Sequence, residues 1–421
     1  MRYSRPAKTM LVLAVVTLLW AGGSLIARAA RQTSDFSLFY RSAMALHEGA
    51  TPEFYGERDP RGEPRSTPPP GTAFWAYMPF MSITGAAAVW YAFNVGLLVL
   101  SAWCLWRIFC RLDRQRRLYR RTWLWVVIVL VFLSADGVQV GQFSVLFVTC
   151  WLLYLLIDHG LVGACLLMLP AVIKVYPALL LAVPPALRRY GQTLWLLPAG
   201  VLTGIVLPLV FYGRDLWWMW DGFLRYALVG RLEHMLRPWV VTNQSLDNLL
   251  YRLLTDQPQF NEAYPFFPHL HLHPALVMHL TVALKLGLLL LTAVAAWRLG
   301  SRVRTQPRWT AMLMLGLWSV ALVLLLPENK APYITYCFPA WLPVLAAISA
   351  QRNRWRYVRD CTLVALALIC QVQLMPHVAR VFMPSLVATA ALGVVLLRMA
   401  WKAHVPAAEK PESTAEVCAP V

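Results

Sequence analysis

Long apolar runs dominate this sequence, and they limit its possible folds more than any other feature. A soluble domain contains about 45–50% apolar and roughly 25% charged residues. Here 59% of the 421 residues are hydrophobic and 14% are charged. Lipid can solvate such a chain, whereas a single water-soluble core cannot accommodate it. The pattern predicts an all-α, polytopic integral membrane protein.

About twelve of these runs are candidates for membrane-spanning helices, although several in the middle are shorter than the ~20 residues of a full crossing. They cover residues 10–26, 85–109, 123–134, 143–157, 161–173, 175–187, 194–211, 275–296, 311–326, 333–350, 362–374 and 385–397. The number of helices within 123–187 stays open at this point.

The net charge of +18 raises the question of nucleic-acid binding. If the N-terminus lies in the cytoplasm and the runs alternate, most basic residues fall on the cytoplasmic side. They include the clusters at 107–121, 188–189, 298–308 and 352–359, and few acidic residues accompany them. This distribution is the positive-inside pattern of membrane proteins. It explains the charge, and no nucleic-acid partner is expected.

The same alternation places two long loops on the outer face, at 28–84 and 212–274. We expect residues 1–402 to form one transmembrane domain and 403–421 to form a flexible cytoplasmic tail. Within the second loop, 216–223 is rich in tryptophan and predicts a helix that lies on the membrane surface. The eight cysteines fall in spans or on the cytoplasmic side, so neither disulfides nor a metal cluster is expected.

Asp35 is the first candidate for chemistry. It directly follows the first span, and in a helix it would share a face with Leu38 and Phe39. A carboxylate at such an apolar boundary can act as a general base. In the structural alternative, Ser34 caps this helix and Asp35 is only a favourable charge near its N-terminus.

A polar segment in the second loop, 242–248, lies between Arg237 and Arg252. Its amide and hydroxyl groups suit the recognition of sugar hydroxyls and phosphate. Lys285 lies well inside an apolar run, and a lysine there either faces a lipid-phosphate groove or forms a salt bridge to another helix. The alternating His269, His271 and His273 could bind metal, but we interpret them as a loop that crosses the interface.

Four segments together resemble glycosyltransferase family 87, the polyprenol-phosphate-mannose-dependent α-mannosyltransferases of the C-type membrane fold. These segments are Asp35-Phe36 with Tyr40; Pro68-Pro69 through Pro79; Gly141-Gln142 with Ser144, followed by Lys174-Val175-Tyr176-Pro177; and Asn243-Gln244-Ser245-Leu246 with Arg252. The resemblance implies a bacterial plasma (inner) membrane enzyme with its active site on the periplasmic side. Such an enzyme moves a sugar, mannose in this family, from a polyprenyl phosphate to a glycolipid or cell-envelope glycan.

The resemblance also implies roles for individual residues. Asp35 would take the proton from the acceptor hydroxyl in a single, inverting displacement. Lys174, Arg237, Arg252 and Lys330 would bind the donor phosphate, although Lys174 could instead snorkel to the headgroups. Tyr40, Gln142, Asn243, Gln244 and Ser245 would bind sugar or acceptor, although Gln142 could instead form an interhelical hydrogen bond. No cofactor and no metal are implied.

One departure from the family pattern lies at 326–333, where relatives place a Ser-Pro and a Trp followed by His. This chain has no histidine there, so Glu328, Lys330 or Tyr333 would have to replace it. The departure leaves room for a pentose donor carrying arabinofuranose or aminoarabinose. Two other classes also remain: a transporter, which would predict internal repeats that we do not find, and a non-catalytic scaffold in envelope polysaccharide assembly.

Overall fold

The computed structural model describes residues 5–57, 65, 67–112, 119–229, 244–256, 270–327, 329–349, 354–371 and 384–402. Within these ranges the regular elements are helices, and none is a strand. The predicted all-α fold is therefore confirmed. The predicted tail, 403–421, lies outside the described residues.

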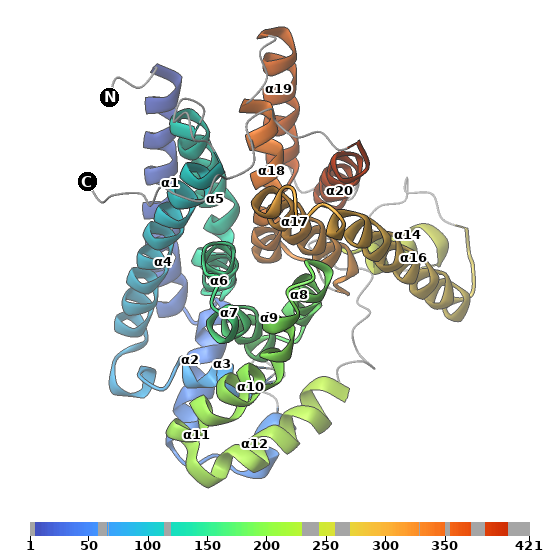
Figure 1. Cartoon of the computed structure of the whole chain (residues 1–421). Helices are drawn as coiled ribbons and strands as arrows, with labels where there is room; N and C mark the ends of the chain where they lie inside the picture. The colour runs from blue at the N-terminus through green and yellow to red at the C-terminus, as the bar shows by residue number, and fades with distance from the viewer. Residues whose placement is uncertain are drawn as a thin grey trace.

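Three long helices form one side of the molecule: α1 (Arg5–Ala30), α4 (Ile83–Leu112) and α5 (Tyr119–Val140). They lie side by side in Figure 1 and exchange polar contacts, such as the one from Gln139 Nε2 to Ser24 Oγ at 2.7 Å. The chain between α1 and α4 forms α2 (Asp35–His47), a 3₁₀ turn η1 (Pro52–Tyr55), α3 (Pro69–Ala73) and η2 (Met78–Phe80). These short elements gather below the helices, where α1 ends (Figure 1).

The next helices are short: α6 (Ser144–Leu156), α7 (Gly160–Ile173), the 3₁₀ segment η3 (Tyr176–Ala182) and α8 (Val183–Ala186). The 13 residues of α6 extend about 20 Å, less than the ~30 Å of a bilayer's hydrocarbon core. Almost all of α6 is buried within the protein. Because α6 is surrounded by protein rather than lipid, it need not cross the whole hydrocarbon core.

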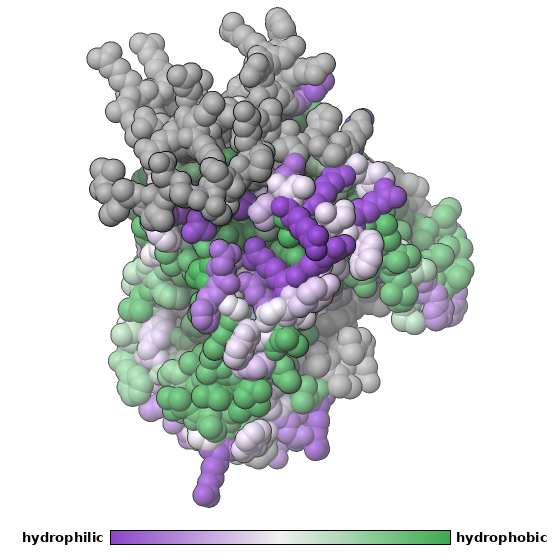
Figure 2. All heavy atoms as spheres, viewed as in Figure 1, coloured by the Kyte–Doolittle hydropathy of each residue, from purple (hydrophilic) through white to green (hydrophobic). Residues whose placement is uncertain are grey.

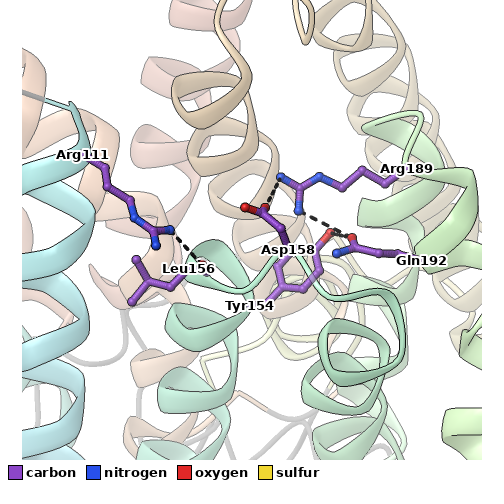
Figure 3. A network of polar contacts seen from close by, with 6 residues as sticks. All are labelled: Arg111, Tyr154, Leu156, Asp158, Arg189 and Gln192. Carbon is purple, nitrogen blue, oxygen red and sulfur yellow. Dashed lines mark hydrogen bonds and ion pairs between the residues drawn. The ribbon is translucent and has the colours of Figure 1, made fainter. Parts of the chain in front are cut away.

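A polar network surrounds the end of α6 that we expect on the cytoplasmic side (Figure 3). Arg111 of α4 donates to the carbonyl of Leu156 at 2.8 Å, and the Tyr154 hydroxyl lies 3.2 Å from Gln192 Oε1. Arg189 lies 3.5 Å from the same oxygen and 4.0 Å from the exposed carboxylate of Asp158. The arginines thus lie at the helix end where unpaired carbonyls favour positive charge.

The middle of the chain comprises α9 (Tyr190–Leu194), α10 (Leu196–Val201), a π-helical turn η4 (Leu202–Val206) and α11 (Leu207–Tyr212). Gly213 follows with φ +52°, and α12 (Leu216–Gly222) then runs off at a marked angle to α11 (Figure 1). The helical segment predicted at 216–223 is confirmed. Its placement on the membrane surface stays a prediction.

The C-terminal part contains α14 (Leu246–Leu254), α16 (Pro274–Gly300), α17 (Pro307–Leu325), the 3₁₀ segment η7 (Ala331–Cys337), α18 (Phe338–Ser349), α19 (Arg354–Gln371) and α20 (Pro384–Lys402). Helix α17 is the central one and is buried along most of its length. By contrast, α16 exposes many leucines and Trp297, which suits contact with lipid.

Eight helices among the described residues are long and apolar enough to cross a membrane, and three shorter apolar helices accompany them. The protein is thus a polytopic membrane protein, while the predicted count of about twelve spans stays a prediction. Figure 2 shows apolar surface on both sides of a central hydrophilic region. Exposed side chains such as Val99, Trp103 and Leu290 contribute to the apolar surface of α4 and α16.

Candidate functional site

The site is built on the tight turn that joins α5 to α6. Gly141 adopts φ +84°, a conformation that side-chain-bearing residues rarely adopt. A Cβ placed on it would lie 2.7 Å from Cβ of Phe36 in α2. The backbone N–H of Gln142 closes the turn by donating to the Gly137 carbonyl at 2.8 Å. The start of α2 therefore packs directly on the residue that precedes Gln142.

Asp35, Gln142 and Lys174 form a chain of hydrogen bonds. The Gln142 amide nitrogen donates to Asp35 Oδ2 at 2.7 Å, and Lys174 Nζ donates to Gln142 Oε1 at 2.6 Å. Gln142 is 5% exposed, while Asp35 and Lys174 are half-buried. Bonds between a neutral amide and charged groups of this length are among the stronger hydrogen bonds in proteins. The Asp35 carboxylate and the Lys174 ammonium thus bind the two polar atoms of the Gln142 amide, the nitrogen and the oxygen respectively.

Aromatic rings from η7 and from the chain after α7 pack next to the Lys174 ammonium. Lys174 Nζ lies 5.0 Å from the centroid of the Tyr333 ring, within the range of a cation–π contact. Tyr333 stacks on Tyr336, with centroids 5.8 Å apart, and lies 6.4 Å from Tyr176. The structure therefore places Tyr333, one of the three residues considered in place of the family's histidine, at the predicted phosphate-binding lysine.

The proline segment, 68–73, packs against the same group. Pro69, Pro70 and Gly71 are buried in α3, and a Cβ on Gly71 would lie 3.4 Å from the carbonyl oxygen of Ile173, the residue before Lys174. Trp75 then stacks between Phe39 and Phe143, at 4.1 and 5.5 Å. Three of the four segments singled out in the sequence thus meet at one place.

The fourth segment forms α14 and the residues before it. The Gln244 N–H donates to the Asn329 carbonyl at 2.7 Å, and Asn329 Nδ2 donates back to the Gln244 carbonyl at 3.4 Å. Ser245 caps α14 by accepting from the Asn248 N–H at 3.2 Å. Arg252 is completely buried. Because Asn329 precedes η7, this segment is attached to the end of the element that carries Tyr333.

Lys285 of α16 forms an ion pair with Asp247 of α14, with Nζ 2.5 Å from Oδ2. The two side chains are 18% and 12% exposed. Burial raises the pKa of Asp247, and the ammonium of Lys285 opposes that shift. Of the two interpretations of Lys285 offered by the sequence, the structure shows the salt bridge to another helix.

The remaining predicted residues either lie apart from this hydrogen-bonded chain or fall outside the described residues. The Tyr40 hydroxyl donates to the Met81 carbonyl at 2.9 Å and so ties α2 to the chain after η2. Lys330 is exposed immediately before η7. Arg237 and Asn243 lie outside the described residues, as does Glu328. None of these positions tests the predicted binding roles.

Within the described chain, no group of three histidine, cysteine or acidic side chains could hold a metal ion. In the histidine run, His271 lies 3.8 Å from Asp256, and His273 accepts from the Ala275 N–H at 3.2 Å and caps α16. His269 lies outside the described residues. The two described histidines thus have structural contacts at a helix start.

Sequence reasoning passed over Asp136. It lies half-buried in the last turns of α5, which continues to Val140, six residues beyond the predicted end of that span. Its neighbour Gly137 approaches Ser144 at the start of α6 and Thr335 of η7. The sequence did contain a signal for this residue, because Asp136 is an acidic residue just beyond the outer end of the apolar run 123–134.

The sequence profile of glycosyltransferase family 87 matches residues 67–327. Gln142, Lys174, Gln244 and Arg252 lie inside the matched region, whereas Asp35, Tyr40, Lys330 and Tyr333 lie outside it. No curated protein and no solved structure matches the chain.

Proposed function

Because the chain belongs to glycosyltransferase family 87, we propose that it transfers mannose from a polyprenyl-phosphate donor to a glycolipid or cell-envelope glycan. We place the reaction on the periplasmic side of a bacterial plasma membrane. The Asp35–Gln142–Lys174 chain is the observation that carries the proposal, because it holds a base and a cation at one site.

The reaction is a single displacement at the anomeric carbon. The acceptor oxygen forms a bond to that carbon while the bond from carbon to the phosphate oxygen breaks. Asp35 takes the proton of the acceptor hydroxyl, and polyprenyl phosphate leaves with the bonding electrons. Lys174 stabilises the negative charge that develops on the leaving phosphate. The configuration at the anomeric carbon is inverted.

The depth of the site supports a lipid-linked donor. The Phe143 ring, next to Gln142, lies 5.2 Å from that of Trp90, seven residues into α4. Seven residues of helix correspond to about 10 Å. The site therefore lies inward from the end of α4, towards the apolar part of the protein. Because the 30 residues of α4 extend about 45 Å and the hydrocarbon core is about 30 Å thick, this position suits the boundary of the bilayer, where a phosphate anchored to a polyprenyl chain would lie.

The proposal is tested by measuring the consumption of synthetic polyprenyl-phosphate mannose by purified protein, with a membrane-lipid extract as the source of acceptors. We expect turnover by the wild type and a loss of at least about a hundredfold in Asp35→Asn. Asp221→Asn is the matched control, because Asp221 is an exposed outer aspartate that pairs with Arg225 at 2.8 Å. It should retain full activity.

The other outcomes are equally informative. Equal turnover by wild type and Asp35→Asn removes Asp35 from the chemistry. Turnover with a pentose donor, but none with mannose, changes the substrate to arabinofuranose or aminoarabinose. Inactivity with every lipid-linked donor contradicts the proposal and favours a transporter.

A further inference from the structure

We propose that Gln142 is a positioning residue, which holds Asp35 and Lys174 one carboxamide apart so that neither charge neutralises the other. This inference rests on the proposed function. The family resemblance implied that Gln142 contacts the sugar or the acceptor directly, and this inference gives it a different role. The residue acts through its two neighbours and does not itself touch the reacting atoms.

Both polar atoms of the Gln142 side chain face charged groups. The NH₂ group donates to Asp35 Oδ2 at 2.7 Å, while Oε1 accepts from Lys174 Nζ at 2.6 Å. A primary amide is a neutral group that donates from its nitrogen and accepts at its oxygen. Within the described chain, the second carboxylate oxygen of Asp35 has no hydrogen-bond partner. That oxygen, Oδ1, is the one placed to receive the acceptor's proton.

The separation matters because a direct ion pair would weaken both partners. An ammonium in contact with a carboxylate favours the ionised form and makes the carboxylate a weaker base. The same contact directs the positive charge at the base instead of at the leaving phosphate. With the amide between them, Asp35 has an ordered hydrogen-bond donor, and the Lys174 ammonium stays beside the Tyr333 ring.

The surroundings of Gln142 hold its amide in place. Its own N–H is bonded to the Gly137 carbonyl, and Gly141 before it packs on Phe36. Phe143 after it is completely buried, with its ring 5.5 Å from Trp75 and 5.2 Å from Trp90. A side chain fixed in this way by its neighbours can define the relative position of two groups on different elements.

The test compares three variants in the mannose-transfer assay, with kcat and the donor KM measured separately. Gln142→Met keeps the length of the side chain but removes both hydrogen bonds, and Gln142→Glu keeps the shape but places a negative charge against Asp35. The matched control is Gln139→Met, because Gln139 is 4% exposed and has a 2.7 Å bond to Ser24 outside the site. Thermal unfolding in detergent accompanies each measurement.

We expect kcat to fall by about a hundredfold in both Gln142 variants, with the donor KM changed less than about threefold, because base and cation lose their relative position. Gln139→Met should keep kcat within about threefold. A raised KM at unchanged kcat would instead show direct substrate binding and overturn the inference. Losses no greater than in Gln139→Met, or Gln142→Glu behaving as wild type, would overturn it as well.

The wild type and Asp35→Asn separate this inference from the proposed function. If the wild type is inactive, the proposed function itself fails. If Asp35→Asn is as active as the wild type, mannose transfer stands, but Asp35 is not the base and the inference about Gln142 is wrong. If both behave as proposed but the Gln142 variants have normal kcat, the positioning role alone is wrong.

Discussion

At the scale of single residues, the ion pair between Lys285 and Asp247 shows how one interaction connects distant parts of the chain. Lys285 lies inside the 27-residue helix α16, and its partner lies in α14. Both side chains are largely withdrawn from solvent. Removing one member of such a pair is costly because the other charge is left buried, whereas removing both is often tolerated.

We therefore expect Lys285→Met and Asp247→Asn each to destabilise the protein by about 3 kcal/mol. The double variant should recover much of that loss. Asp256→Asn is the control, because Asp256 belongs to an exposed contact with His271 and such contacts contribute little. The measurement is unfolding in detergent followed by tryptophan fluorescence. Additive losses in the double variant would show that the two side chains do not interact.

At the scale of elements, the turn between α5 and α6 requires glycine at 141. Alanine there would combine an unfavourable positive φ with a Cβ only 2.7 Å from Phe36. Relieving the overlap would displace α2, and with it Asp35, from Gln142. We expect Gly141→Ala to lower mannose transfer by at least about tenfold.

Gly96→Ala provides the control, because Gly96 lies within α4 and nothing lies within 4 Å of its Cβ position. That variant should be fully active and slightly more stable, since alanine favours a helix over glycine by about 1 kcal/mol. Transfer activity and thermal unfolding of the two purified variants check the prediction. A fully active Gly141→Ala protein would show that the turn does not position Asp35.

The same elements show what the sequence could and could not predict. Hydropathy located the helices because membrane solvation selects apolar runs. Helix α2 begins at Asp35 with Ser34 as its N-cap residue, as the structural alternative expected, although the Ser34 side chain makes no capping hydrogen bond. The 3₁₀ geometry of η7 was not predictable, because the segment reads as the beginning of an apolar span at 333–350. The position of Tyr333 over Lys174 depends on that geometry. The end of α5, six residues beyond the predicted run, was also not predictable, whereas α6 matches its predicted run, 143–157, within one residue at each end.

At the scale of the whole molecule, the asymmetry of basic residues predicts one orientation in the membrane. Ser82, before α4, should face the periplasm, and Ser301, after α16, should face the cytoplasm; both are exposed. We expect a membrane-impermeant maleimide to label Ser82→Cys but not Ser301→Cys in bacterial spheroplasts, beyond the labelling of the unsubstituted chain. Permeabilised membranes should label both. The reverse pattern would place the site on the cytoplasmic side.

The Asp35–Gln142–Lys174 chain also has a consequence for biosynthesis. Its members are separated by 107 and 32 positions in the sequence. A nascent chain therefore exposes Asp35 long before the ribosome has made the glutamine and lysine that complete the site. If these residues have the proposed roles, a partly inserted chain would hold its base without its cation and could not yet catalyse transfer. We expect transfer only once Lys174, which follows α7, has docked beside Gln142 and Asp35, so that turnover would report the assembly of this site.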